Sequence, residues 1–369
     1  MLTPTHRVLT PVAGALCATG VLWAVRRWRN DAPFEDYVEA VRFQRGHIPF
    51  ASTLWRTISA AFSVATGAPV GREGSMIQFA AAVTSWVGKR SPVPTLSVAR
   101  QVSYGAAAAI AAVYSAPLAG VCFAFEIVLG GWSWTEVLPL LLSSTAGWFA
   151  SRTFLGAGPL FAVHEAICIR SAVSWGAALA LVMGLFAPIY LKLLRSFHSV
   201  SRWPLALVWA GALVGALSLF RPEVWGNGDV GLLTSLSGSP TLAAAAVVSI
   251  LALRLLATSV CVGSGTVGGV FTPTLFAGAA SGLAAGRLLH LQHPAVFAVI
   301  GMATLLSAVT QAPLMATLMA VELTGLWHLL LLLLFLNLFA GRLARALRSK
   351  SLYAIATPDP KSSSQLVVS

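Results

Sequence analysis

Two glycine-rich turns in this sequence have the composition of an anion-binding site. Residues 68–75 read APVGREGS, residues 265–273 read GTVGGVFTP, and an apolar, helix-like run follows each turn. Glycine turns leave backbone N–H groups accessible, and the start of a helix adds the positive end of its dipole. Two such helix starts inside a membrane can hold an anion without a fixed positive charge. The first turn alone contains a carboxylate, Glu73, which makes Glu73 the leading candidate for chemistry at the site.

Two further acidic residues, Glu126 and Glu322, lie in apolar sequence. An acidic side chain at the centre of a membrane helix costs about 2.5–3.5 kcal/mol, so all three glutamates are functional candidates by default. Glu126 lies nine residues after Pro117 (126 − 117), and Glu322 lies nine residues after Pro313 (322 − 313). A carboxylate at equivalent positions of two halves favours a structural role, such as a hydrogen bond at a helix end. The turn in the second half that matches the Glu73 turn has no acidic residue. The carboxylate of Glu73 is therefore expected to occupy the anion site or to be displaced from it.

Two other side chains could contribute to such a site. Arg72 could be an anion ligand, but an arginine beside a membrane turn more often extends to the interface or braces the loop, and we favour that interpretation. Tyr353 follows the last basic cluster, and on composition alone it is interpreted as an interfacial tyrosine.

The composition identifies an integral membrane protein. Of the 369 residues, 57% are hydrophobic and 10% are charged, and the mean hydropathy is +0.80. A soluble domain has about 25% charged residues. A bilayer crossing takes about 20 residues as a helix, and the alternating pattern of a β-barrel is absent from the sequence, so we expect an all-α polytopic fold. The segments without Asp, Glu, Lys or Arg include 8–25, 101–125, 137–151, 171–191, 203–220, 230–253, 255–286, 288–321 and 323–341.

The formal net charge of +12 does not indicate a nucleic-acid partner. The basic residues lie in short connections between apolar segments, where the positive-inside rule places both clusters on the cytoplasmic side. The four cysteines show no metal or redox spacing and are assigned to packing. The first basic cluster is Arg26, Arg27 and Arg29, the last is Arg342, Arg345, Arg348 and Lys350, and the cysteines are Cys17, Cys122, Cys168 and Cys261.

An internal repeat divides the chain into two halves. Residues 105–118 align with residues 301–314 at a constant offset of 196 (301 − 105 and 313 − 117). Halves of this kind in transporters are usually inverted, with the binding site at their interface. The predicted organisation is a transmembrane domain at 1–353, with a first repeat at about 8–165 and a second at about 170–353, and a short disordered cytoplasmic tail at 354–369.

Several apolar segments are too short for a full crossing. Pro and Gly interrupt the segments 73–88, 97–112 and 117–130, which indicates broken helices around a site at the membrane midplane. Residues 31–45 form the most charged part of the chain, and their pattern predicts a short amphipathic helix opened by Pro33.

In its glycine turns and in the motifs around its glutamates, the sequence resembles the CLC family of chloride channels and chloride/proton antiporters. The resemblance covers residues 8–353. Two details, DY at 36–37 and VWGNG at 224–228, are similar to its bacterial ClcB-type branch. The motifs that carry the resemblance are GREG at 71–74, APLAG at 116–120, GVFTP at 269–273 and ELT at 322–324.

The resemblance implies two inverted repeats whose broken helices meet at a mid-membrane anion site, in a homodimer with one pathway per subunit. It implies that Glu73 is the gate and that the backbone N–H groups of Val270 and Phe271 line the central anion site. It also makes the Tyr353 hydroxyl the inner ligand, which replaces the interfacial interpretation. Chloride is the transported ion, no cofactor is implied, and the expected location is a bacterial inner membrane. The remaining anion-binding candidates are Gly71, Arg72, Gly74 and Asn30.

The sequence departs from the family pattern in three places. The family's GSGIP motif aligns with RNDAP at 29–33, so Asn30 stands where the serine ligand is expected and Pro33 alone is shared. Ile127 stands where the antiporters have an inner proton-transfer glutamate. The family has a further N-terminal span before residue 8, so we expect that this chain starts late.

Three functions are each favoured by some feature of this sequence. A gated chloride channel leads, because Ile127 cannot titrate. A chloride/proton antiporter of the same fold is the alternative. An intramembrane enzyme is the third, because Ser264 lies between two glycines and could be a nucleophile. A serine nucleophile needs an oriented base, and His290 and His293 have no acidic partner nearby in the sequence, so we expect no enzyme.

Overall fold

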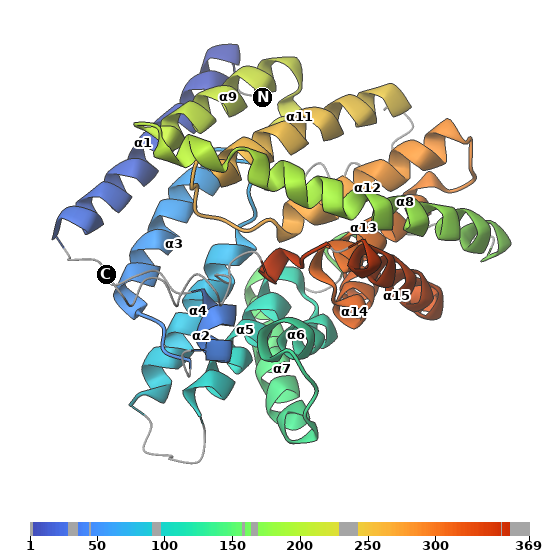
Figure 1. Ribbon diagram of the computed structural model, residues 1–369, viewed down its shortest axis with the longest axis horizontal. Coiled ribbons are helices and arrows are strands. Elements are labelled where there is room, and N and C mark those ends of the chain that lie inside the picture. The colour runs from blue at the N-terminus through green and yellow to red at the C-terminus, as the bar shows by residue number, and fades with distance from the viewer. Residues whose placement is uncertain are drawn as a thin grey trace.

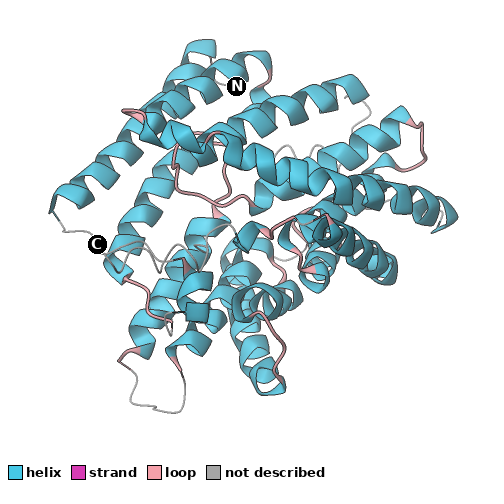
Figure 2. Ribbon diagram, in the orientation of Figure 1, coloured by secondary structure: helices cyan, strands magenta, loops and turns pink. Residues whose placement is uncertain are grey.

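The computed structural model is almost wholly helical. It describes residues 3–28, 36–43, 46–90, 97–156, 159–163, 169–228, 243–347 and 349–354. Within these ranges the regular structure is helix, apart from one isolated bridge between Gly71 and Gly269 (Figure 2). Asn30, Pro33 and the predicted tail from residue 355 onward lie outside the described residues.

The first half contains seven α-helices and one π-helical turn among its described residues. The short helix predicted within residues 31–45 is α2, and the predicted short segments correspond to α4, α5 and α6 with η1. The elements are α1 (Pro4–Trp28), α2 (Tyr37–Phe43), α3 (Phe50–Ala65), α4 (Glu73–Gly88), α5 (Val98–Tyr114), α6 (Pro117–Phe123), the π-helical η1 (Ala124–Leu129) and α7 (Trp134–Leu155).

The second half repeats much of this order. Between its α-helices lie short 3₁₀ turns, η2 (His198–Arg202), η3 (Pro222–Val224), η4 (Trp327–Leu329) and η5 (Leu352–Ala354). The α-helices are α8 (Ile169–Ser196), α9 (Ala206–Phe220), α11 (Ala244–Gly263), α12 (Phe271–Leu288), α13 (Pro294–Thr310), α14 (Pro313–Thr324) and α15 (Leu330–Ala346).

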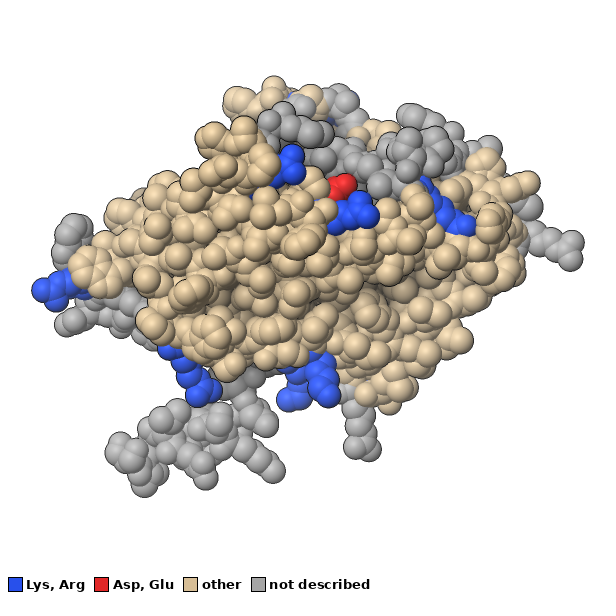
Figure 3. Space-filling model, turned by 90° about the horizontal axis from the view of Figure 1, so that it is seen from above, with Lys and Arg blue, Asp and Glu red and all other residues tan. Residues whose placement is uncertain are grey.

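Most helices of each half cluster together, and α1 is the exception because it packs against the second half. In Figure 1, α2 to α7 gather at the lower left and α12 to α15 gather at the right, while α1 packs beside α9 at the upper left. Four helical segments of the described chain are long and apolar enough to span a bilayer, and the other apolar helices are shorter. A broad band without coloured charged residues crosses the described part of the face in Figure 3, and the Lys and Arg side chains seen there lie along its borders. The four spanning segments are Pro4–Val25, Ser171–Arg202, Ala244–Gly263 and Trp327–Ala346.

The repeat read from the sequence reappears in the helix boundaries. α5 and α13 begin and end at the same offset (294 − 98 and 310 − 114 are both 196). Each is followed by a non-glycine residue in the left-handed conformation, Ser115 (φ 53°) or Gln311 (φ 61°). In each half a new helix then begins at a proline, Pro117 or Pro313, since proline is favoured at the first helical position. The break between these helices is therefore built into both halves.

The carboxylates of Glu126 and Glu322 hold the two halves together in a reciprocal way. Glu126 accepts hydrogen bonds from the N–H groups of Leu314 (3.2 Å) and Met315 (2.7 Å) at the start of α14. Glu322 accepts them from Leu118 (3.0 Å) and Ala119 (2.8 Å) at the start of α6. The structural role predicted for this pair is confirmed, because each carboxylate satisfies N–H groups that lack partners within their own helix.

These exchanged contacts relate the halves by a local two-fold axis. The donors in α14 lie 196 residues after the donors in α6 (314 − 118 and 315 − 119), and the acceptors differ by the same 196 (322 − 126). A contact that is repeated with its two partners exchanged requires such an axis. A local two-fold axis between the halves is what the expected inverted arrangement of the repeats requires.

Candidate anion site

The two glycine turns meet where the halves join. The N–H of Gly71 donates to the carbonyl of Gly269, and the N–H of Gly269 donates to the carbonyl of Gly71, both at 2.6 Å. A Cβ atom at Gly74 would lie 2.7 Å from the Cα of Gly269, which is closer than real Cβ contacts allow. Glycine is required here because two backbones are in contact. The turns thus bring the starts of α4 and α12 together.

The carboxylate of Glu73 lies at the start of α12, in the opposite half of the chain. Its Oε1 accepts from the backbone N–H of Thr272 at 2.9 Å, and its Oε2 accepts from the Thr272 hydroxyl at 3.0 Å. The side chain is 1% exposed. The start of a helix attracts negative charge through its N–H groups and its dipole. Glu73 therefore occupies the position where a free anion would be held.

Val270 and Phe271 provide the other N–H groups at this helix start. Val270 caps α12 and Phe271 is its first residue, so their N–H groups have no acceptor within the helix. Both residues line a cavity of about 280 Å³ that also contacts Glu73 and Gly74. These residues were candidates from the sequence, and in the structure they line the same cavity.

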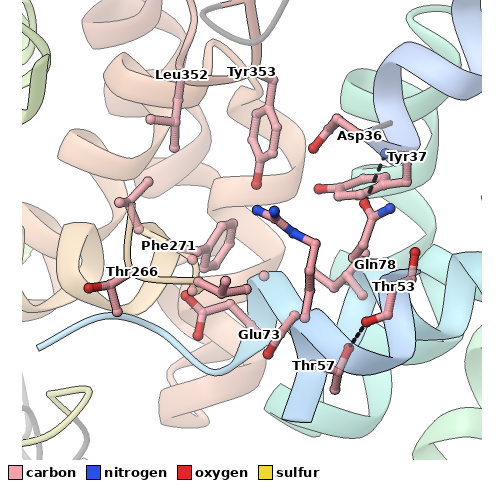
Figure 4. Close-up of a pocket in the computed structure, with 18 residues that line it drawn as sticks. Asp36, Tyr37, Thr53, Thr57, Glu73, Gln78, Thr266, Phe271, Leu352 and Tyr353 are labelled. Carbon is pink, nitrogen blue, oxygen red and sulfur yellow. Dashed lines mark hydrogen bonds between the residues drawn. The ribbon is translucent and has the colours of Figure 1, made fainter. Parts of the chain in front are cut away.

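Tyr353 reaches the same cavity from the C-terminal segment. Its side chain shares a hydrogen bond with that of Tyr37, and the two hydroxyl groups point into the cavity from different sides (Figure 4). The ring of Tyr353 packs edge-on against Phe123, with 6.0 Å between the ring centroids. The N–H of Tyr37 donates to Oε1 of Gln78 on α4 at 3.0 Å. One phenol of the pair donates to the other, so one of the two hydroxyl protons remains for an anion.

The cavity contains two charged side chains that sequence reasoning did not assign to the site, Arg56 and Asp36. Arg56 could have been noticed, because it is the one charged residue between positions 48 and 70. Asp36 accepts from the N–H of Val38 at 2.8 Å at the start of α2. Burial raises the pKa of the Asp36 carboxyl above its usual value, although its hydrogen bonds to Val38 and Glu39 oppose that rise. The cavity therefore holds a cation and a second carboxyl group besides Glu73.

Gly71 lies against the carboxylate of Glu73, since a Cβ atom added at Gly71 would overlap that carboxylate. Gly71 is buried in the bridge between the turns. The side chain of Arg72 is exposed and does not line the cavity, and its carbonyl accepts from the hydroxyl of Ser75. Asn30 lies outside the described residues. Ser264 bonds to the carbonyl of Cys261 at 2.8 Å and to the hydroxyl of Thr266 at 3.0 Å, and neither partner is a general base.

Ile127 lies on η1, close to a cation. Its side chain is 3% exposed, and its carbonyl accepts from the Arg42 guanidinium at 2.6 Å. Arg42 belongs to α2, so the contact joins α2 to the end of the π-helical turn. The position at which the sequence lacks a carboxylate therefore has an apolar side chain and a backbone carbonyl that binds a cation.

Comparison with known proteins assigns this arrangement to a family. The family described as "Voltage gated chloride channel" matches residues 14–345. The chain belongs to this family. A ClcB-like protein of Ralstonia nicotianae is 38% identical to this CLC chain over 366 residues, which cover 95% of the chain and 85% of that protein. The voltage-gated ClC-type chloride channel ClcB of Citrobacter koseri is 35% identical over 373 residues, covering 95% and 87%.

Solved CLC structures share the fold. A slow cyanobacterial Cl⁻/H⁺ antiporter superposes with a TM-score of 0.84 and 24% identity, over 95% of this chain and 86% of that one. A CLC-type fluoride/proton antiporter superposes with a TM-score of 0.77 and 19% identity, over 95% and 88%. The predicted CLC fold of two inverted repeats with broken helices is confirmed. At these identities the likeness concerns the fold alone.

Proposed function

We propose that this CLC chain is a gated chloride channel and that Glu73 is its gate. The observation that carries the proposal is the placement of the Glu73 carboxylate on both the N–H and the hydroxyl of Thr272. A carboxylate held there is a tethered anion that competes with chloride for one helix start. Chloride would displace it, and protonation would remove its charge and release it.

The cavity supplies a route by which chloride reaches the gate. Arg56 places a positive charge in the cavity, which opposes the carboxyl groups of Asp36 and Glu73 and favours entry of an anion. The Tyr353 hydroxyl is the proposed inner ligand, and the N–H groups of Val270 and Phe271 are the proposed central ligands. Charge-assisted hydrogen bonds of this kind replace part of the hydration shell of the ion. Chloride would therefore pass from the tyrosines to the start of α12.

The surroundings of Ile127 favour a channel over an exchanger. Proton transfer through an apolar interior needs titratable groups or ordered water along the way. Ile127 is buried and cannot titrate, and the Arg42 guanidinium on its carbonyl disfavours a proton nearby. Glu126, the preceding residue, uses both carboxyl oxygens to bind the start of α14.

A chloride/proton antiporter is the second candidate, because Asp36 lines the same cavity as Glu73. A proton on Asp36 would need a hydrogen-bonded route to Glu73, and Tyr37 and Tyr353 lie in the same cavity. The solved relatives of similar fold are named as antiporters. Asp36 would then replace the missing carboxylate at position 127.

The reversal potential of reconstituted protein separates the two functions. Liposomes with a fixed chloride gradient are measured while the pH gradient is varied. A channel reverses at the chloride equilibrium potential at every pH difference, whereas an antiporter shifts with the proton gradient. If the potential shifts and Asp36→Asn abolishes the shift, the antiporter replaces the channel.

The gate is tested separately with Glu73→Gln. Glutamine has no negative charge, so the variant should carry more chloride than the wild type and should lose the pH dependence of the flux. Tracer flux from liposomes at several pH values measures both effects. Wild-type flux with the wild-type pH profile would remove Glu73 from this role.

The proposed assembly is a homodimer in a bacterial inner membrane, with one pathway in each subunit. Large apolar side chains are exposed on α7 and α15, where a second copy or lipid would cover them. Cross-linking in the native membrane tests the dimer, and recovery of the monomer alone after cross-linking would contradict it. The exposed side chains are Trp134, Leu138, Leu142, Phe149 and Phe154 on α7, and Leu331, Phe335 and Phe339 on α15.

A further inference from the structure

We propose that Tyr114 is a positioning residue that holds the gate closed through Thr272. This inference rests on the proposed role of Glu73. The hydroxyl of Tyr114 lies 2.8 Å from Oγ1 of Thr272, and that Oγ1 lies 3.0 Å from Oε2 of Glu73. A chain of two hydrogen bonds therefore runs from the end of α5 to the gating carboxylate.

The chemistry of the three groups sets the direction of this chain. A carboxylate can only accept, so the single proton of the Thr272 hydroxyl is donated to Glu73. The oxygen of Thr272 can then only accept from Tyr114, which makes the phenol the donor. Donation to a hydroxyl oxygen polarises it and strengthens the bond that it donates in turn. Tyr114 thus stabilises the closed position of Glu73 through Thr272.

The position of the phenol follows from the break between α5 and α6. Tyr114 is the last residue of α5, directly before the left-handed Ser115. Its ring packs against Phe271, with 5.3 Å between the centroids. The side chain is 4% exposed, so packing against the protein, and not contact with solvent, sets the position of its hydroxyl. The helix break of the first half therefore brings a phenol to the helix start of the second half.

The repeat indicates that this chain of bonds serves the gate rather than the fold. Position 114 corresponds to Thr310 (114 + 196), whose hydroxyl bonds to Leu306 in its own helix at 2.7 Å. Position 272 corresponds to Gly74 (272 − 198), which has no side chain. Position 73 corresponds to Phe271 (73 + 198). All three members are therefore absent from the other copy, unlike Glu126 and Glu322, which hold the fold in both.

The test compares the chloride dependence of flux in Tyr114→Phe and wild-type protein in liposomes. Phenylalanine keeps the ring contact with Phe271 and leaves Thr272 able to donate to Glu73. Chloride competes with the carboxylate, so the chloride concentration at half-maximal flux should fall about twofold, because donation from the phenol strengthens the bond from Thr272 to the charge by about 10–30%. The maximal flux should not change, because saturating chloride displaces the gate in both proteins. Thr272→Val, which removes the direct bond to the charge, should lower that concentration about tenfold or more.

Tyr190→Phe is the matched control. Tyr190 is also buried and its hydroxyl lies 3.0 Å from a threonine of α12, Thr274, but that threonine donates to the carbonyl of Val270. The half-maximal concentration of this variant should equal that of the wild type. A similar fall in Tyr190→Phe would show that any lost phenol loosens α12, and it would overturn the proposal.

The dependence on Glu73 is measured in a Glu73→Ala background. There the change Tyr114→Phe should have no effect on the half-maximal concentration, because no carboxylate remains to be held. An unchanged concentration in Tyr114→Phe alone, or the same fall with and without Glu73, contradicts the proposal. Failure of Glu73→Gln to alter flux would instead contradict the gate itself. The two ideas are thus separable.

Discussion

Replacing Glu322 with glutamine should destabilise the protein while leaving transport by each folded molecule unchanged. Both oxygens of Glu322 accept backbone N–H groups, from Leu118 at 3.0 Å and from Ala119 at 2.8 Å. A glutamine amide has one acceptor oxygen, so one of the two N–H groups loses its partner and faces an NH₂ group instead. The start of α6 would then contain an unsatisfied buried donor.

The size of the effect follows from that lost acceptor. Leaving a buried donor unsatisfied costs about 1–3 kcal/mol. Glu126→Gln should cost a similar amount, since its contacts with Leu314 and Met315 have the same geometry at 3.2 and 2.7 Å. Glu126 is more exposed than Glu322, so its cost should lie toward the lower end of this range. The two helix starts belong to α6 and α14, which pack together, so the double variant reports their coupling.

The assay is denaturant unfolding of the purified protein in detergent, followed by tryptophan fluorescence. The midpoint should fall in Glu322→Gln and in Glu126→Gln. Glu39→Gln, which removes a carboxylate on α2, is the control and should change stability by less than about 0.5 kcal/mol. Chloride flux and reversal potential are measured on the same preparations and divided by the folded fraction.

Two results would refute the reasoning. A wild-type midpoint in either glutamine variant would mean that these carboxylates do not stabilise the helix starts. Wild-type stability together with an altered reversal potential would assign Glu126 or Glu322 to a proton path. The structural role requires the opposite combination, lower stability with unchanged transport.

Two further predictions concern the site and the junction of the halves. Tyr353→Phe should raise the chloride Kd about tenfold or more, since one charge-assisted hydrogen bond is lost; isothermal titration measures it, and an unchanged Kd returns Tyr353 to the interfacial interpretation. Gly74→Ala should cost about 1–3 kcal/mol of stability by overpacking, because its Cβ would lie 2.7 Å from the Cα of Gly269. Gly20→Ala on α1 is the control, since nothing lies within 4 Å of its added Cβ, and equal midpoints for the two alanine variants would contradict the backbone contact.

Much of the fold could be predicted because its signals are local. Hydropathy and charge-free segments identified a helical membrane protein, and prolines marked the starts of α6 and α14. The repeat at an offset of 196 predicted the shared structural role of Glu126 and Glu322, and their hydrogen bonds confirm it. That each carboxylate binds the other half could not be read from the sequence, because the repeat relates equivalent positions and does not state which half contacts which.

The candidate site was predicted in part. Glu73 was found because a lone carboxylate at a glycine turn is visible in an apolar sequence, whereas Val270, Phe271 and Tyr353 were assigned through the family resemblance. Asp36, Tyr37 and Gln78 were not assigned, because nothing in their local pattern differs from that of an ordinary short helix. They enter the site through the packing of α2 on α4, where the N–H of Tyr37 meets Gln78 across 41 residues of chain.

The sequence by itself determined that this is a helical membrane protein of two related halves with one unmatched carboxylate at a glycine turn. Those features depend on residue type and on spacing along the chain, which a sequence states directly. The tertiary structure alone decided that the carboxylate of Glu73 binds Thr272, 199 residues away, and that Tyr114 reaches the same threonine from a helix break. Hydrogen bonds between such distant residues form only after the helices have packed, so no local pattern encodes them.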